Sequence, residues 1–216
     1  MLGGFDVMVG AQVVPSVAWR QRRAASIIQM LALAPNHRMH REHLMEAFWP
    51  TLDLPDQANN LRQTLHHARK AIESAGMPRG TVLTRDGESV VLASSAAIEP
   101  DIWVDVLAFQ RAVDAAWSAL TPSTAQAALA LYAGDLLPND PFDAWVEDLR
   151  TGLRASYLAL LTRLGQLYAE RGQPTEAIGV FHRLIASEPT LESAYVALMR
   201  LHATLDQRDI ALAQYD

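Results

Sequence analysis

The stretch that decides the fold is residues 56–73, which read DQANNLRQTLHHARKAIE. When successive residues are placed at intervals of about 100° around a helix, the aliphatic side chains of this stretch fall on one narrow stripe. Asp56, directly after Pro55, is a residue type that caps the start of a helix. The pattern therefore predicts an amphipathic helix over residues 56–73, with one face buried against a core. The stripe consists of Leu61, Leu65, Ala68 and Ile72.

The opposite face of this predicted helix is polar and carries no acid before Glu73. It presents amides, imidazoles and cations, which can bond base edges and phosphates. A rigid rod with such a face is what a helix entering a DNA major groove requires. An ordinary solvated helix surface is the alternative interpretation of the same pattern. The polar residues are Asn59, Asn60, Arg62, Gln63, His66, His67, Arg69 and Lys70.

The net charge of −6 looks unsuitable for a protein that binds nucleic acid until the chain is divided. Residues 1–80 carry nine Arg and Lys against six Asp and Glu, together with five of the seven His. Residues 81–216 carry nine Arg against eighteen Asp and Glu. The first part therefore has a net charge of +3 and the remainder has −9. This asymmetry favours a nucleic-acid module joined to a module that contacts proteins.

Short β-rich segments and two further helices surround the central stretch. Asp86-Gly87 between two β-rich runs is a strong signal for a tight hairpin. Strands, three helices and a last hairpin, in that order, are the arrangement of a winged helix-turn-helix. The third helix is then the reader and the last hairpin is the wing. The predicted elements are a hairpin over residues 5–14, helices over residues 21–34, 40–48 and 56–73, a connection over residues 36–39 and a hairpin over residues 82–92.

From Asp101 onward the pattern is helical, and the longest predicted helix covers residues 142–171, with an interruption near Thr151-Gly152. Part of the remaining chain matches the tetratricopeptide spacing of Leu-Gly, Tyr, Ala, Phe and Pro. Small alanines there allow paired helices to cross closely, and aromatic side chains fill the gap between turns. Generic antiparallel helices remain the alternative. The matching residues are Leu164, Gly165, Tyr168, Ala177, Phe181 and Pro189, with Leu198, Ala211 and Tyr215 at the equivalent positions 34 residues later.

The chain resembles a known family in two consecutive segments. Residues from about 5 to 92 resemble the OmpR-like winged helix of SARP-type (antibiotic-regulatory) activators. Residues from about 102 to the end resemble the bacterial transcriptional activator domain that follows it in this family. The likeness is carried by QRRA at 21–24, HLMEAFWP at 43–50, ANNLRQ at 58–63, WVDVLAF at 103–109, LLP at 136–138 and PFDAW at 141–145.

The resemblance implies a bacterial regulator that binds double-stranded DNA, with helix 56–73 in the major groove. It implies that the loop over residues 51–55 corresponds to the segment that touches RNA polymerase in related activators. We expect the helical repeats to mediate self-association or to bind a partner protein. The positions that match base contacts are Asn59, Asn60, Gln63, His66 and His67. Those nearer phosphates are Arg62, Thr64, Arg69 and Lys70, and Arg85 lies where the wing reaches the minor groove or the backbone.

Enzymatic and metal chemistry find no support in the sequence. It contains no GxxxxGK[ST] phosphate loop, no GxSxG elbow and no HExxH motif, and the absence of Cys removes thiolate nucleophiles. The adjacent His66 and His67 point about 100° apart on a helix and lack metal-ligand spacing. No apolar run reaches the length of a membrane span. We therefore predict a cytoplasmic protein that is not an enzyme, with no cofactor, metal or membrane partner.

The predicted fold class is mainly α with a small β component. A winged helix-turn-helix domain covers residues 1–98, and an all-α tetratricopeptide-like domain covers residues 99–216, where the last repeat is incomplete. Two other functions stay open. One is a protein-interaction scaffold whose winged helix no longer reads DNA, because the family often has Ser-Arg-Leu-Arg-Arg where residues 66–70 read HHARK. The other is the regulatory N-terminal part of a longer multidomain protein.

Overall fold

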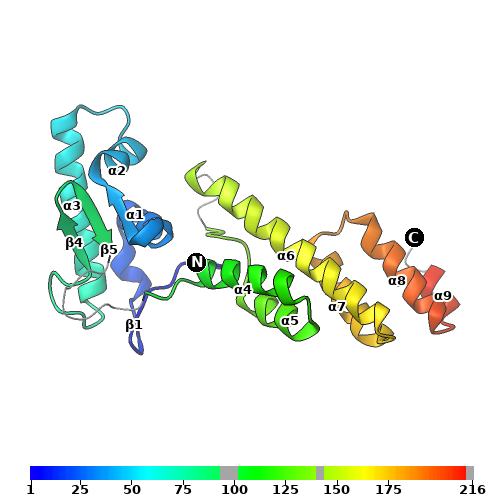
Figure 1. The fold of residues 1–216 in the computed structure, drawn as a ribbon. Coiled ribbons are helices and arrows are strands. Elements are labelled where there is room, and N and C mark those ends of the chain that lie inside the picture. Colours follow the sequence, from blue (N-terminus) through cyan, green and yellow to red (C-terminus); the bar gives the residue numbers. More distant parts are fainter. Residues whose placement is uncertain (93–101, 140–143, 213–216) are drawn as a thin grey trace. The chain divides into compact units, whose positions relative to one another are not determined.

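A computed structural model of the chain describes residues 1–92, 102–139 and 144–212. The chain divides into two compact units. Unit 1 consists of Met1 and Phe5–Val104, and unit 2 consists of Leu2–Gly4 and Asp105–Asp216. The predicted domain boundary between residues 98 and 99 lies outside the described residues. Figure 1 shows unit 1 with its small sheets and helices α1–α3, and unit 2 with helices α4–α9.

Unit 1 has the predicted order of strands, three helices and a final hairpin. Its second sheet contains β3, β5 and β4 in that spatial order, and all pairs are antiparallel. The first hairpin is shorter than residues 5–14, because only two residues of each strand pair. The elements are β1 (Met8–Val9), β2 (Gln12–Val13), the 3-10 helix η1 (Ser16–Trp19), α1 (Arg22–Leu33), the 3-10 helix η2 (Pro35–His37), β3 (Arg38–His40), α2 (Arg41–Phe48), α3 (Leu54–Glu73), β4 (Leu83–Asp86) and β5 (Ser89–Leu92).

Strand β3 is an element that the sequence patterns miss. They predict a connection over residues 36–39 and a helix that begins at His40. Instead, Arg38 pairs with Val91 in β5, and His40 caps α2 by accepting a hydrogen bond from the backbone of Glu42. The prediction was wrong because three residues show no period of their own. Such a strand is defined by its pairing with a distant partner.

Helix α3 begins two residues earlier than predicted. Its cap is Asp53, whose Oδ1 accepts a hydrogen bond of 2.9 Å from the backbone N–H of Asp56. The prediction of Asp56 as the cap was wrong because Pro55 fits the first turn of a helix, where its missing N–H costs nothing. The turn before α3 is held from inside by Gln57, whose Nε2 donates to the carbonyls of Trp49 (2.8 Å) and Leu52 (3.1 Å).

All regular secondary structure in the described residues of unit 2 is helical, apart from one β-bridge between Leu2 and Leu136. Helix α6 continues through Thr151 and Gly152, so the predicted interruption there was wrong. A single Gly weakens a helix by only about 1 kcal/mol, which packing against neighbours outweighs. None of the described helices is long and apolar enough to cross a membrane. The helices are α4 (Asp105–Ala119), α5 (Pro122–Leu131), α6 (Ala144–Glu170), α7 (Pro174–Ser187), α8 (Glu192–Thr204) and α9 (Arg208–Leu212).

The packing of α6 against α7 confirms the tetratricopeptide-like repeat. Gly165 in α6 lies directly against the ring of Phe181 in α7. Ala177 is fully buried, as the close crossing of two helices requires. In the second copy of the repeat, Ala211 is also buried, whereas Tyr215 lies outside the described residues. The tetratricopeptide spacing in the sequence therefore corresponds to contacts between α6 and α7 in the structure.

Replacing Gly165 with Ala should destabilise unit 2, because the added Cβ would lie 2.8 Å from the ring of Phe181. We expect the free energy of unfolding to fall by about 1–3 kcal/mol, as is usual for overpacking. Gly152→Ala in the same helix is the matched control, since nothing lies within 4 Å of its Cβ. That variant should gain about 0.5–1 kcal/mol from better helix propensity. Chemical denaturation measures both changes, and equal stability of the two variants would contradict the assigned packing.

Candidate nucleic-acid interface

The candidate interface is built on α3, which its apolar stripe fixes to the core of unit 1. Leu61, Leu65, Ala68 and Ile72 are all buried, as predicted. Helix α3 packs against α1, α2 and η1. At its C-terminal end, Ala71 joins a small cluster with Val14 and Ala75 beneath the first hairpin. These contacts lie on one side of the helix, and most of the polar side chains on the opposite side are exposed.

The predicted polar face of α3 is largely exposed. Within this face, Arg62 donates a hydrogen bond of 2.7 Å to the side-chain oxygen of Asn59. The rings of His66 and His67 lie edge to face, with their centroids 5.7 Å apart. Donors and acceptors along about three turns therefore point away from the core of unit 1. The exposed members are Asn59, Arg62, Gln63, His66, His67 and Lys70.

Two residues of the predicted set are less available than expected. Thr64 is only 6% exposed, and its hydroxyl donates a hydrogen bond of 2.8 Å to the carbonyl of Asn60. This burial argues against the phosphate contact expected of Thr64, which lies on the side of the helix that faces the core. Asn60 itself is half-buried at the edge of the polar face. The burial of a residue at such an edge depends on neighbouring elements, which the spacing of residues along one helix does not reveal.

Arg69 links α3 to the wing. Its Nε donates a hydrogen bond of 2.8 Å to the carbonyl of Leu83 in β4. Burial is the main cause that lowers the pKa of the Arg69 guanidinium, while Glu73 raises the pKa and Arg85 lowers it further. The last effect means that Arg69 and Arg85 repel each other across this part of the surface. The sequence predicted both as DNA contacts but not the backbone bond that positions Arg69.

A hollow of about 260 Å³ lies between α2, α3 and the wing. Four arginines line it, and three of them already have partners: Arg62 bonds Asn59, Arg41 pairs with Glu88, and Arg69 bonds the carbonyl of Leu83. Arg41 is a member that the sequence patterns did not single out. In the sequence, Arg41 is a single cation at the start of α2, and nothing in its spacing connects it with α3 or the wing. The lining consists of Arg41, Met45, Pro55, Ala58, Asn59, Leu61, Arg62, Leu65, Arg69, Arg85 and Val90.

The wing is the hairpin of β4 and β5, with Arg85 opposite Val90. Arg85 is exposed, whereas Leu83 and Val90 are buried. Ion pairs tie the hairpin to neighbouring elements, because Arg38 in β3 pairs with Asp86 at 2.6 Å. The hairpin is therefore a supported element, and Arg85 projects from it on the side that carries the hollow.

The turn between α2 and α3 and the first residue of α3 present apolar side chains to solvent. Leu54 is 68% exposed and Leu52 is 38% exposed. The side-chain amide of Gln57 holds the carbonyls of Trp49 and Leu52, and Asp53 between the two leucines caps α3. Across residues 1–92, 102–139 and 144–212, no group of three or more His, Asp or Glu has the arrangement of a metal site. The exposed polar groups of α3 and Arg85 are suited to binding an anionic polymer, and Leu52 and Leu54 are suited to a small apolar contact.

The family of the bacterial transcriptional activator domain matches residues 104–216. No curated protein matches the sequence. Among solved structures, the chain is similar to EmbR of Mycobacterium tuberculosis in complex with a low-affinity phosphopeptide, with a TM-score of 0.73 and 20% sequence identity. The similarity covers 100% of this chain but only 56% of the EmbR chain. The chain therefore belongs to the bacterial transcriptional activator domain family, which confirms the predicted resemblance of its C-terminal part.

Proposed function

We propose that unit 1 binds double-stranded DNA, with α3 in the major groove and the β4–β5 hairpin against the backbone or minor groove. The observation that carries this proposal is the exposed face of α3, which has amides, imidazoles and cations and no acid between Asp56 and Glu73. A helix has the diameter that the major groove accommodates. A bacterial regulator that binds DNA in this way works in the cytoplasm, where the DNA lies.

The side chains divide into two kinds of contact. Amides and imidazoles at the centre of the exposed face bond base edges and provide sequence preference: Asn59, Gln63, His66 and His67, with Asn60 at the edge. Cations at its margins and on the wing neutralise phosphates and provide most of the affinity: Arg62, Lys70 and Arg85. Arg69 reaches the backbone from the base of the wing. A phosphate there relieves the repulsion between Arg69 and Arg85.

In this proposal, unit 2 joins two copies of the chain or binds a partner protein. Stacked helical repeats expose side chains on a regular scaffold and commonly bind other proteins. Self-association of two chains, or a shared partner, would place two DNA-reading units on neighbouring sites. Linking two modest binders raises their combined affinity through effective concentration without any new DNA contact. The modest net charge of +3 in residues 1–80 makes such pairing important.

Removing three exposed cations should weaken DNA binding and flatten its dependence on salt. We predict that Arg62→Ala, Lys70→Ala and Arg85→Ala, combined in one protein, reduce the slope of log affinity against log salt concentration by about 2–3, because each phosphate contact contributes about 0.9. Arg69 is left in place because it holds the wing through Leu83. Fluorescence anisotropy with mixed duplexes at several salt concentrations measures the slope.

The matched control replaces three cations of unit 2 with alanine: Arg111, Arg171 and Arg183. It changes the net charge equally and should leave the slope within experimental error. Equal, salt-insensitive weakness of the parent protein and both variants would instead favour the interaction scaffold without DNA reading. A slope that falls equally in both variants would show that binding reflects net charge rather than α3 and the wing.

We further propose that residues 51–55, which lead into the first turn of α3, contact RNA polymerase through Leu52 and Leu54. Leu54→Ser should lower transcription about 5- to 30-fold, the effect of losing about 1–2 kcal/mol of contact energy, while DNA affinity stays unchanged. A reporter gene behind a selected binding site measures this. Val17→Ser, another exposed apolar residue of unit 1, is the control. Equal loss of transcription in both variants, or a parallel loss of DNA affinity, would contradict the assignment.

A further inference from the structure

The residues before the winged helix are built into the helical unit. Leu2 forms an antiparallel bridge with Leu136 and is only 5% exposed. Its backbone N–H donates a hydrogen bond of 2.7 Å to Oδ2 of Asp105, at the start of α4. The N–H of Gly3 donates one of 3.0 Å to the carbonyl of Asp135. After residues 2–4, the chain leaves unit 2 at Gly4–Phe5 and returns to it at Val104–Asp105.

Two glycines make this docking possible. Gly3 has a φ of +78°, and a Cβ on it would lie 2.9 Å from the carbonyl oxygen of Ala133. Gly134 has a φ of +151°, and a Cβ there would lie 3.0 Å from the Cα of Gly3. Two backbones meet here without room for a side chain on either. By contrast, nothing lies within 4 Å of a Cβ placed on Gly4.

Asp135 is the point at which this N-terminal segment meets a polar network. Its backbone carbonyl holds Gly3, and its carboxylate accepts a hydrogen bond of 2.7 Å from the hydroxyl of Tyr132. The same carboxylate pairs with Arg154 of α6, whose Nη1 lies 3.0 Å from Oδ2 and 3.2 Å from Oδ1. Burial, with the hydrogen bond to Asp135 next, raises the pKa of Tyr132, which keeps its hydroxyl protonated as a donor.

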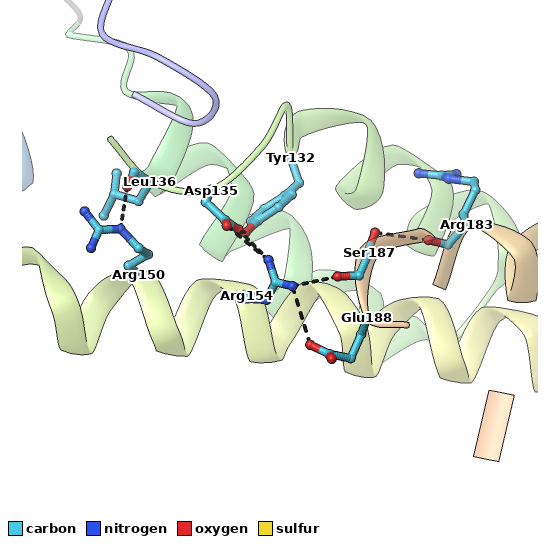
Figure 2. A network of polar contacts seen from close by, with 8 residues as sticks. All are labelled: Tyr132, Asp135, Leu136, Arg150, Arg154, Arg183, Ser187 and Glu188. Atoms are coloured by element: carbon cyan, nitrogen blue, oxygen red, sulfur yellow. Dashed lines mark hydrogen bonds and ion pairs between the residues drawn. The ribbon is translucent and has the colours of Figure 1, made fainter. Parts of the chain in front are cut away.

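Arg154 extends the network to the end of α7. Its Nη2 donates a hydrogen bond of 2.6 Å to the carbonyl of Ser187, and Oε2 of Glu188 lies 3.5 Å away. Figure 2 shows Arg154 between Asp135 on one side and Ser187 with Glu188 on the other. One guanidinium thus connects the loop after α5 with the turn between α7 and α8. Because its donors are fixed in one plane, moving either partner disturbs the other.

We propose that residues 2–4 form a strap whose closure is coupled, through Asp135 and Arg154, to the turn that follows α7. When the Ser187–Glu188 turn holds Arg154, Asp135 is fixed and the strap stays docked. When the contacts between that turn and Arg154 break, Arg154 no longer holds the carboxylate of Asp135 in place, and the strap opens. The segment that leads into the winged helix then loses its second connection to unit 2. This inference rests on the geometry of unit 2 and does not require DNA binding.

The size of the contact fits such a device. The strap is held by one buried leucine side chain, the bridge to Leu136 and hydrogen bonds donated by the backbone N–H groups of Leu2 and Gly3, which is little compared with a packed helix. Elements of this kind open locally while the remainder of a protein stays folded. The strap can therefore open in response to a small change at the Ser187–Glu188 turn while the helical repeats of unit 2 stay folded.

Hydrogen exchange of the backbone amides at positions 2 and 3, measured by NMR on the full chain, tests whether the strap closes. We expect exchange at least about 100-fold slower than in an unstructured peptide. Gly3→Ala should abolish this protection, because the Cβ meets Ala133. Gly4→Ala is the matched control and should leave it intact. Free exchange in the parent protein, or equal protection in the two variants, would overturn the strap.

The coupling is tested with Arg154→Gln, which should increase exchange at positions 2 and 3 about 10-fold or more. Arg163→Gln is the control on the same helix, since Arg163 pairs with Glu170 instead. Glu188→Gln weakens only the outer end of the network and should give a smaller increase, which keeps the test valid if Arg154→Gln impairs folding. Helix content from circular dichroism identifies that case. Unchanged protection in a folded Arg154→Gln protein, or in Glu188→Gln if Arg154→Gln does not fold, would overturn the coupling.

Discussion

The burial of four aliphatic side chains along one stripe of α3 is the constraint on which the rest of unit 1 depends. Leu61, Leu65, Ala68 and Ile72 fix the rotation of the helix about its own axis. Because a helix has a single rotation, burying that stripe determines which residues remain exposed. The polar face of Asn59, Gln63, His66 and their neighbours is therefore a consequence of apolar packing on the other side. A helix that rolled by one residue would bury those amides without partners, at a cost that hydrophobic contact could not offset.

Contacts at both ends of α3 hold the neighbouring turn and the wing in fixed positions before anything binds. At the start, Gln57 and Asp53 hold the turn that exposes Leu54. Toward the end, Arg69 holds the first strand of the wing through Leu83. The turn before α3 and the β4–β5 hairpin are thus both attached to the same helix. Prearrangement of this kind reduces the conformational entropy that binding would otherwise remove.

The sequence predicted the elements with strong periods and missed those that depend on distant partners. The stripe of α3, the Asp86-Gly87 hairpin and the Gly165–Phe181 contact were all visible as spacing. Strand β3 was missed because its partner lies about fifty residues away. The bond from Arg69 to Leu83, the burial of Thr64 and the docking of Leu2 against Leu136 also require long-range neighbours. The start of α3 was misplaced for a local reason, since two aspartates three residues apart can each act as a cap.

The most direct test of the account is where α3 lies when DNA is bound. A photo-crosslinking amino acid placed at Gln63 should attach to bases in a pool of random duplexes, because that position lies at the centre of the exposed face. The same amino acid at Glu170, an exposed position of unit 2, should attach to little or no DNA. Equal attachment at the two positions, or none at Gln63 while the protein remains bound to DNA, would contradict the account.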